Sequence, residues 1–185
     1  LASKSDLTAK MTVFRKGGEY YVFGKYYLPT DAVEPGKPNY DFYSGWAKDG
    51  WLTLIDGGLT DYDYIERAVL EDMRYVQPER VGVDPWNATH LSTRLMANGV
   101  PVEDVPQNVK TLSEPMKTLQ ALVLNGKIHH NGDPVLSWAM SNVSAKVDHK
   151  DEVYPRKARF ENKIDPAVAL ASCVPSSASR GPSAG

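Results

Sequence analysis

Three aspartates stand beside the ends of predicted strands and helices. Asp84 follows the short stretch RVGV and precedes Pro85, and Asp165 follows NKI. Asp6 stands just before the first predicted strand. Clustered carboxylates repel one another unless a hard divalent cation neutralises them, and oxygen ligands suit Mg²⁺ or Mn²⁺. If the three converge, two such ions about 4 Å apart would activate a water and stabilise the leaving oxygen in phosphodiester cleavage.

Each of these aspartates also has a structural interpretation. Asp84 stands at the carboxyl end of a strand, where ligands gather in α/β sheets, but one aspartate there is more often structural than catalytic. Asp165 is followed by Pro166, a pattern typical of a helix N-cap. Asp6 fits a turn residue equally well. The three are too far apart in sequence for spacing alone to show that they converge.

Several other chemistries lack their sequence signatures. The chain has no G-x-x-x-x-G-K-[ST], no G-x-G-x-x-G after a strand and no G-x-S-x-G, so a P-loop, a dinucleotide fold and a hydrolase elbow are excluded. Its single cysteine, Cys173, excludes an internal disulfide and a multi-cysteine zinc site. The four histidines show no metal-ligand spacing, and structural or surface roles are expected for them: His90, His129, His130 and His149.

The chain of 185 residues, 24% charged and 42% hydrophobic, fits one globular domain without a membrane span. Its net charge is −2, but residues 154–163 hold four basic side chains against Glu161. Such a run is either a solvated loop or a polyanion-binding segment. Residues 174–185 are rich in Pro, Ser, Gly and Ala, which predicts a folded domain over 1–173 followed by a flexible tail.

The elements that must position these residues follow from periodicity and turn chemistry. Aromatic and β-branched residues predict a hairpin of two strands joined at Gly17-Gly18. Further strands are expected within 51–58, 80–85, 100–107 and 144–148. Helices are expected over 40–50, 60–77 (capped by Thr60), 87–98, 111–125, 134–143 and 164–173. A hairpin at the start of the chain, followed by alternating strands and helices, predicts an α/β fold with a mixed sheet.

Four blocks in one order carry a resemblance to a known family: LASKSDLTA, VGVDPWNAT, the long run VPQNVKTLSEPMKTLQALVLNGKIHHNGDPVLSWAMSNV, and KIDPAVALA. Together they resemble the C-terminal nuclease domain of the large terminase subunits of tailed bacteriophages, over about residues 1–172. The resemblance implies a ribonuclease H-like mixed sheet flanked by helices. It also implies a metal-dependent endonuclease that cuts concatemeric double-stranded DNA during packaging, using two Mg²⁺ or Mn²⁺ ions.

The resemblance assigns roles to particular residues. Asp84 matches the family's strand-end carboxylate, Asp165 the carboxylate that begins the last helix, and Asp6 the second acid of the motif D-L-x-S-x-x-D-L-T-A. These three are the expected catalytic metal ligands. The first acid of that motif would stand just before Leu1, so we expect a truncated first strand and impaired metal binding. The resemblance also implies that basic residues line the approach of DNA to the site: Lys146, Lys157, Arg159 and Lys163.

The family pattern further implies an ATPase motor domain, a small terminase subunit and a portal as partners, with action in the host cytoplasm. Two alternatives stay open. The chain could be another ribonuclease H-like nuclease, resolvase or transposase core, although such proteins lack the block matched here by Asp133 to Trp138. It could also be a non-catalytic module that docks DNA or a portal through exposed aromatic residues, which are otherwise expected in the core: Tyr40, Phe42, Tyr43, Trp46 and Trp51.

Overall fold

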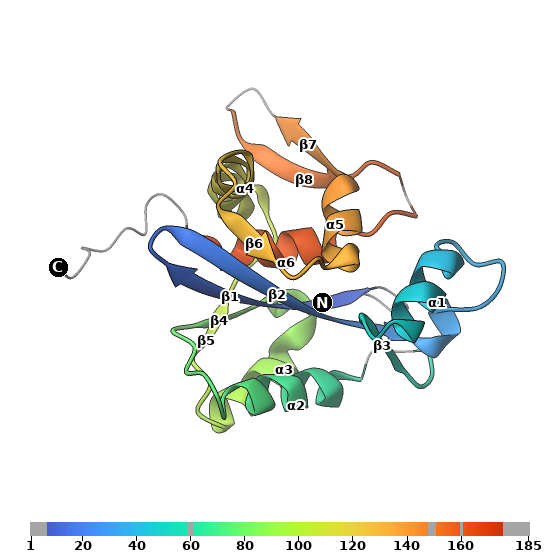
Figure 1. Cartoon of the computed structure of the whole chain (residues 1–185). Coiled ribbons are helices and arrows are strands. Elements are labelled where there is room, and N and C mark those ends of the chain that lie inside the picture. The colour runs from blue at the N-terminus through green and yellow to red at the C-terminus, as the bar shows by residue number, and fades with distance from the viewer. Residues whose placement is uncertain (1–6, 59–60, 148–150, 160, 176–185) are drawn as a thin grey trace.

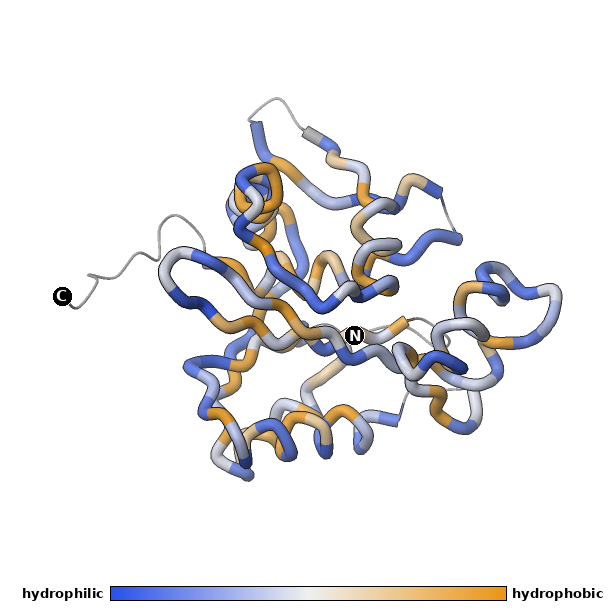
Figure 2. Tube along the Cα trace, in the orientation of Figure 1, coloured by the Kyte–Doolittle hydropathy of each residue, from blue (hydrophilic) through white to orange (hydrophobic). Residues whose placement is uncertain are grey.

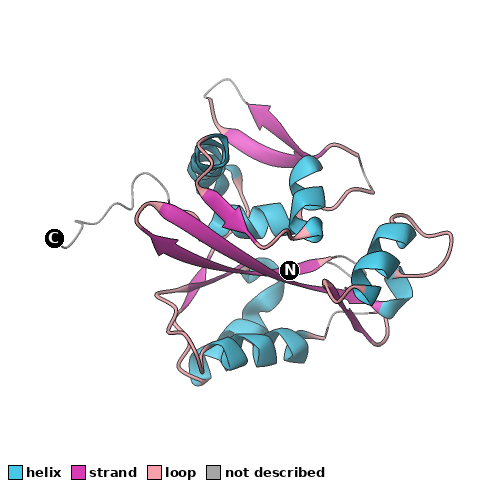
Figure 3. Cartoon of the chain, viewed as in Figure 1, coloured by secondary structure: helices cyan, strands magenta, loops and turns pink. Residues whose placement is uncertain are grey.

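The structure, a computed structural model, describes residues 7–58, 61–147, 151–159 and 161–175. Strands and helices alternate along most of the chain (Figure 3). The strands are β1 (Thr8–Lys16), β2 (Glu19–Pro29), β3 (Leu52–Ile55), β4 (Val81–Val83), β5 (Val102–Asp104), β6 (Ile128–His130), β7 (Val143–Val147) and β8 (Val153–Lys157). The helices are α1 (Tyr40–Lys48), α2 (Tyr62–Asp72), α3 (Pro85–Ala97), α4 (Val109–Leu124), α5 (Pro134–Ser141) and α6 (Asp165–Cys173), with a 3-10 turn, η1, at Thr30–Ala32.

The long hairpin of β1 and β2 forms the centre of the molecule. The two strands pair antiparallel from Thr8 opposite Tyr27 to Lys16 opposite Glu19. Gly17 and Gly18, both at positive φ, make the turn that closes this register. Strands β3 and β6 each pair parallel to β2, so this sheet is mixed.

Two further strand pairs complete the fold. Strands β4 and β5 pair in parallel, with Val83 opposite Asp104 at their carboxyl ends. Strands β7 and β8 pair antiparallel and stand apart at the top of the molecule, beside α4 and α5 (Figure 1). Parallel neighbours need a crossover between them, and α3 supplies the one between β4 and β5.

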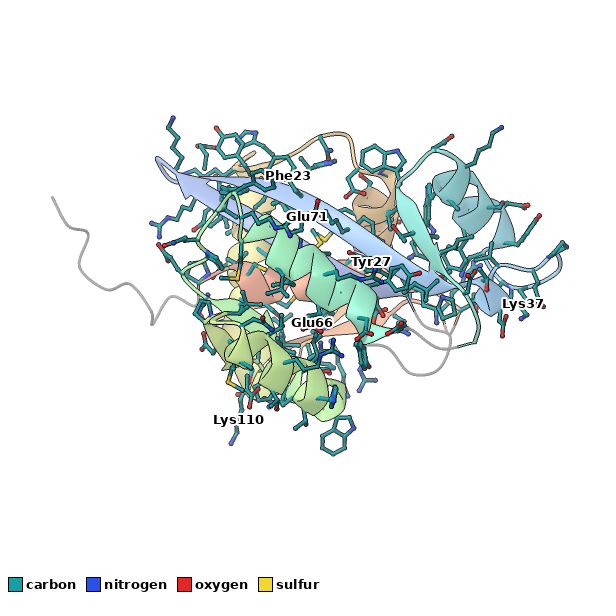
Figure 4. All side chains as sticks on the ribbon, turned by 90° about the horizontal axis from the view of Figure 1, so that it is seen from below. Phe23, Tyr27, Lys37, Glu66, Glu71 and Lys110 are labelled. Carbon is teal, nitrogen blue, oxygen red and sulfur yellow. The ribbon has the colours of Figure 1, made fainter. Side chains whose placement is uncertain are left out.

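Helices cover both faces of the hairpin, because successive residues of a strand point to opposite faces. Tyr26 is buried with α4, α5 and α6 in one core, whereas the adjacent Tyr27 is buried with α2 and α3 in another. Figure 1 shows these two helix groups above and below the sheet. Figure 4 shows α2 across the lower face, with Tyr27 beside it and Glu66 toward α3. Hydrophobic residues accordingly concentrate on strands and inward helix faces (Figure 2).

The expected fold class is confirmed, with corrections at the element ends. Asp61, rather than Thr60, caps α2: its carboxylate accepts a hydrogen bond from the Asp63 amide at 2.9 Å. Thr60 itself lies outside the described residues. The helix ends at Asp72, five residues before the expected end at 77, and a turn over 73–75 follows it.

Strands β6 and β8 are absent from the expected elements, and β8 is the one that changes how the basic run is interpreted. It covers the first half of the basic run, and Pro155 stands inside it, opposite Ala145 of β7. Proline is tolerated in a strand only at an edge or a bulge, and β8 pairs with β7 alone among the described strands. The run 154–163 is therefore an edge strand followed by a loop.

The packed region continues to Val174, which is buried in the same core as α6. Residues 176–185 of the expected tail lie outside the described residues. Among the described residues, none of the helices is long and apolar enough to cross a membrane.

Candidate active site

Asp84 stands at the junction of β4 and α3. Val83, the last residue of β4, is buried in the lower core, and Pro85 takes the first position of α3. Asp84 has extended backbone angles and caps the helix, with its Oδ1 accepting a hydrogen bond from the Trp86 amide at 3.2 Å. Strand, proline and cap together hold this half-buried carboxylate at a strand end.

Tyr62, the first residue of α2, lies within electrostatic range of Asp84. Burial raises the pKa of the Tyr62 phenol, and the negative charge of Asp84 raises it further. The start of α2 therefore borders the carboxylate, and the phenol stays neutral at physiological pH.

Asp165 is the first residue of α6 and does not cap it. The N-cap is Ile164, so the expected N-cap role of Asp165 is wrong. Ile164 is buried beside Leu112 and Val168, and this packing draws the chain into the helix one residue early. Asp165 is half-buried, and its Oδ2 is shielded from solvent. A shielded carboxylate oxygen at the start of a helix is compatible with a metal ligand.

Packing on the sheet determines where α6 lies. Its last residue, Cys173, has its Sγ 3.9 Å from the backbone oxygen of Met11 in β1. Burial raises the pKa of the Cys173 thiol to about 11, and the positive charge of Arg80 acts in the opposite direction. The end of α6 thus lies beside β1 and near Arg80, which precedes β4. At the other end, the Asn142 side chain donates to the Lys163 backbone oxygen at 3.2 Å.

The third expected ligand, Asp6, lies outside the described residues. Within the described part of the chain, no group of three or more His, Cys, Asp or Glu side chains could bind a metal. The structure thus gives Asp84 and Asp165 each a defined position at an element end, and the three-carboxylate site stays a prediction.

The expected DNA-binding residues do not share one face. In the β7–β8 ladder, Lys157 is opposite Val143, whereas Lys146 is opposite Tyr154. Directly opposed residues lie on the same face and neighbours alternate, so Lys146 and Lys157 project to opposite sides. Arg156, which the expected set omitted, alternates to the same face as Lys146, a relation visible only once β8 is known to be a strand.

The other two basic residues lie in the loop between β8 and α6. Arg159 is exposed and Lys163 is half-buried, two residues before Asp165. The Asn39 side chain donates a hydrogen bond to the Glu161 backbone oxygen at 2.9 Å. This contact ties the loop to the start of α1, and Figure 2 shows the loop as mostly hydrophilic.

The described histidines have structural or surface positions, as expected. His129 stacks on Tyr21 with ring centroids 5.1 Å apart, and its Nε2 lies 2.8 Å from Glu19 Oε2. His130 Nδ1 accepts a hydrogen bond from the Asp133 amide. His90 is exposed on α3, and His149 lies outside the described residues.

The aromatic residues of α1 form part of the core. Tyr43 and Trp46 are buried, and both pack against Trp138 of α5. Phe42 is half-exposed and stacks on Trp46. The alternative of an aromatic docking surface therefore loses Tyr43 and Trp46 to the core.

Asp133 is a buried carboxylate with a donor on each of its two oxygens. It is 1% exposed, accepts a hydrogen bond from the Tyr26 hydroxyl at 2.6 Å, and caps α5 through the Leu136 amide at 2.9 Å. A Cβ at Gly24 would overlap the Tyr26 hydroxyl. This network joins β2 to α5 and makes the Asp133–Trp138 block a structural one.

Known proteins resemble this chain along most of its length. Protein YmfN of Escherichia coli strain K12 is 32% identical over 186 residues, which cover 94% of this chain and 41% of YmfN. The large terminase subunit of Enterobacteria phage HK97 is 25% identical over 178 residues, which cover 94% of this chain and 35% of that protein. The chain thus spans less than half the length of either relative.

The fold is shared with a solved structure. The crystal structure of the HK97 bacteriophage large terminase matches with a TM-score of 0.81 and 24% identity, over 91% of this chain and 36% of that one. The family model for the endonuclease domain of the terminase large subunit matches residues 1–180. A match over nearly the whole sequence means that this chain belongs to the terminase large subunit endonuclease domain family.

Proposed function

We propose that this chain is a metal-dependent DNA endonuclease that cuts concatemeric double-stranded DNA during viral genome packaging. The observation that carries the proposal is the family match over residues 1–180, together with Asp84 held at a strand end. The proposed partners are double-stranded DNA, an ATPase motor domain, a small terminase subunit and a portal, in the host cytoplasm.

The position of α6 in the fold supports one shared site for Asp84 and Asp165. Cys173, at the end of α6, lies beside β1 and near Arg80, which precedes β4. The nine residues of α6 span about 13 Å, and the chain from Arg80 to Asp84 spans about the same length. The proposal places α6 antiparallel to β4, which would bring the two aspartates to one edge of the sheet.

The donor chemistry fits the proposed metal. Asp84, Asp165 and Asp6 supply only carboxylate oxygens, the ligands that Mg²⁺ and Mn²⁺ prefer, and Asp165 Oδ2 is shielded from solvent. Two bound ions would supply Lewis-acid activation of water and of the leaving oxygen. The protein's own part is to hold these carboxylates in position and to orient the DNA backbone through Lys146, Lys157, Arg159 and Lys163.

Plasmid nicking in Mn²⁺ tests the proposal. Asp84→Asn keeps a side-chain oxygen that can cap α3 but removes the charge, so it separates the proposed metal role from the cap. We expect Asp84→Asn and Asp165→Asn each to lower nicking more than about a hundredfold, beyond the loss usual for outer-shell partners. Thermal melting of the same variants should stay close to that of the wild type.

Asp41→Asn is the matched control, because Asp41 is an exposed carboxylate in the first turn of α1, and its nicking should equal that of the wild type. Nicking that survives both chelator and Asp84→Asn refutes the proposal. Calorimetric titration with Mn²⁺ distinguishes the docking alternative: a nuclease site binds the ion and loses binding in Asp84→Asn, whereas a docking module shows no difference between the two proteins.

A further inference from the structure

Trp86 is the most exposed of the large hydrophobic side chains described, at 89%. The other three tryptophans behave differently: Trp46 is buried, and Trp51 and Trp138 are half-buried against the same core. Single apolar side chains are common on protein surfaces, so exposure alone means little. The position of this indole beside a proposed metal ligand gives the exposure its significance.

Trp86 is held in a defined relation to Asp84. Its main-chain amide donates to Asp84 Oδ1, and Pro85 restricts the backbone between the two residues. Because Asp84 and Trp86 are two positions apart in the chain, their Cα atoms are at most about 7 Å from each other. Successive nucleotides of one DNA strand rise by about 3.4 Å, so a phosphate at Asp84 has its neighbouring bases within reach of the indole.

The surface around the indole accepts a nucleic acid. Helix α3 contains no acidic residue, and its described exposed side chains after Trp86 are neutral or weakly basic: Thr89, His90, Thr93, Met96 and Ala97. Asp63, at the nearby start of α2, forms an ion pair with Arg94 of α3, which offsets its negative charge. A DNA strand along this face therefore meets little repulsion from α3.

We propose that Trp86 is a DNA-contacting residue that stacks on an unpaired base next to the phosphate at Asp84. The inference rests on the proposed function. Bases stack on aromatic side chains without sequence preference, whereas a base inside an intact duplex is already stacked on its neighbours and must leave them first. Trp86 therefore favours DNA that is frayed or locally open at the cutting point.

The test compares binding of two DNAs of equal length, an intact duplex and a duplex with a short unpaired bubble, in Ca²⁺ to suppress cutting. Trp86→Ala should weaken bubble binding about tenfold, the loss typical of one base–aromatic stack, and change duplex binding by less than about twofold. Trp86→Phe should restore most of the bubble affinity. Tyr75→Ala is the matched control, because Tyr75 is an exposed aromatic, at 82%, beyond the end of α2.

Intrinsic fluorescence supplies a second measurement, since Trp86 is the most exposed of the four tryptophans. Bubble DNA should quench the emission of the wild type and leave that of Trp86→Ala nearly unchanged. Equal bubble affinity of Trp86→Ala and wild type, in a protein that nicks plasmid, overturns the inference and leaves the proposed function intact. A wild type that neither binds DNA nor nicks it refutes the proposed function, and the inference falls with it.

Discussion

The Tyr26–Asp133 hydrogen bond illustrates how single residues hold the proposed site's scaffold. Both groups are buried, and burial raises the pKa of the Tyr26 phenol well above its usual range, with the Asp133 hydrogen bond and charge adding to the effect. The phenol thus remains a donor at all physiological pH values. Because a buried carboxylate without its donors is costly, this contact contributes to stability mainly by satisfying Asp133.

Tyr26→Phe should lower the free energy of unfolding by about 1–3 kcal/mol, the cost of leaving a buried acceptor unsatisfied. Urea denaturation measures the loss. Tyr21→Phe is the matched control, since Tyr21 is exposed on the same strand and should change stability by less than about 0.5 kcal/mol. Equal stabilities of the two variants would contradict the role assigned to Asp133.

At the scale of elements, α2 is tethered to the sheet at its last residue. The carboxylate of Asp72 forms ion pairs with Lys10 of β1 and Lys25 of β2. Burial acts to raise the pKa of Asp72, and the hydrogen bonds and charges of the two lysines outweigh it, so the pKa is lowered. Burial lowers the pKa of Lys10, and its pairing with Asp72 opposes that change.

Asp72→Asn should lower the melting temperature at pH 7 by about 2–4 °C, the equivalent of about 1 kcal/mol in a chain of this size. The pKa of Asp72 is lower in the folded state, so its stabilisation is fully present above the unfolded pKa of about 3.8 and is lost as the pH falls through the folded value. Melting curves between pH 3 and 7 should therefore show wild type and variant converging in acid. A constant difference across this range would contradict the tether.

At the scale of the whole molecule, the expected DNA contacts and the expected metal ligands come from different parts of the fold. Asp84 belongs to the β4–α3 unit below the sheet, whereas the β7–β8 hairpin stands above it (Figure 1). Lys163 lies two residues before Asp165, the expected ligand at the start of α6, which belongs to the helix group above the sheet. A phosphate contact from Lys163 would therefore lie nearer the proposed chemistry than one from the hairpin.

Lys163→Ala should weaken DNA binding for every sequence alike and make the slope of log K against log salt shallower by about 1, the expected result of losing one phosphate contact. Titrations between 50 and 200 mM salt measure the slope, which is about −0.9 for each phosphate neutralised. Lys16→Ala, at the exposed tip of the β1–β2 hairpin, should leave the slope unchanged. An unchanged slope in Lys163→Ala would remove Lys163 from the DNA contacts.

Much of the fold was predictable because its signals are local. The Gly17-Gly18 hairpin, the amphipathic α4 and the proline-marked starts of α5 and α6 all depend on residues close in sequence. Strand β8 was not predictable from local signals, because Pro155 and the basic side chains disfavour a strand. Only pairing with β7 stabilises it. The faces of Lys146 and Lys157, and the exposure of Trp86, depend on that same long-range packing.

The three Asp–Pro pairs show which features the sequence determines and which the tertiary structure determines. The sequence by itself determined the family and predicted a helix at or just after each pair, because proline suits the first turn and aspartate its amino-terminal end, although it placed the start of α3 at 87 rather than at Pro85. Only the tertiary structure decided the role of each aspartate. Asp84 and Asp133 cap their helices, whereas burial of Ile164 moves the helix start back by one residue and leaves the Asp165 carboxylate out of the cap. Capping is a local hydrogen bond, but packing against distant residues sets the backbone angles that permit it.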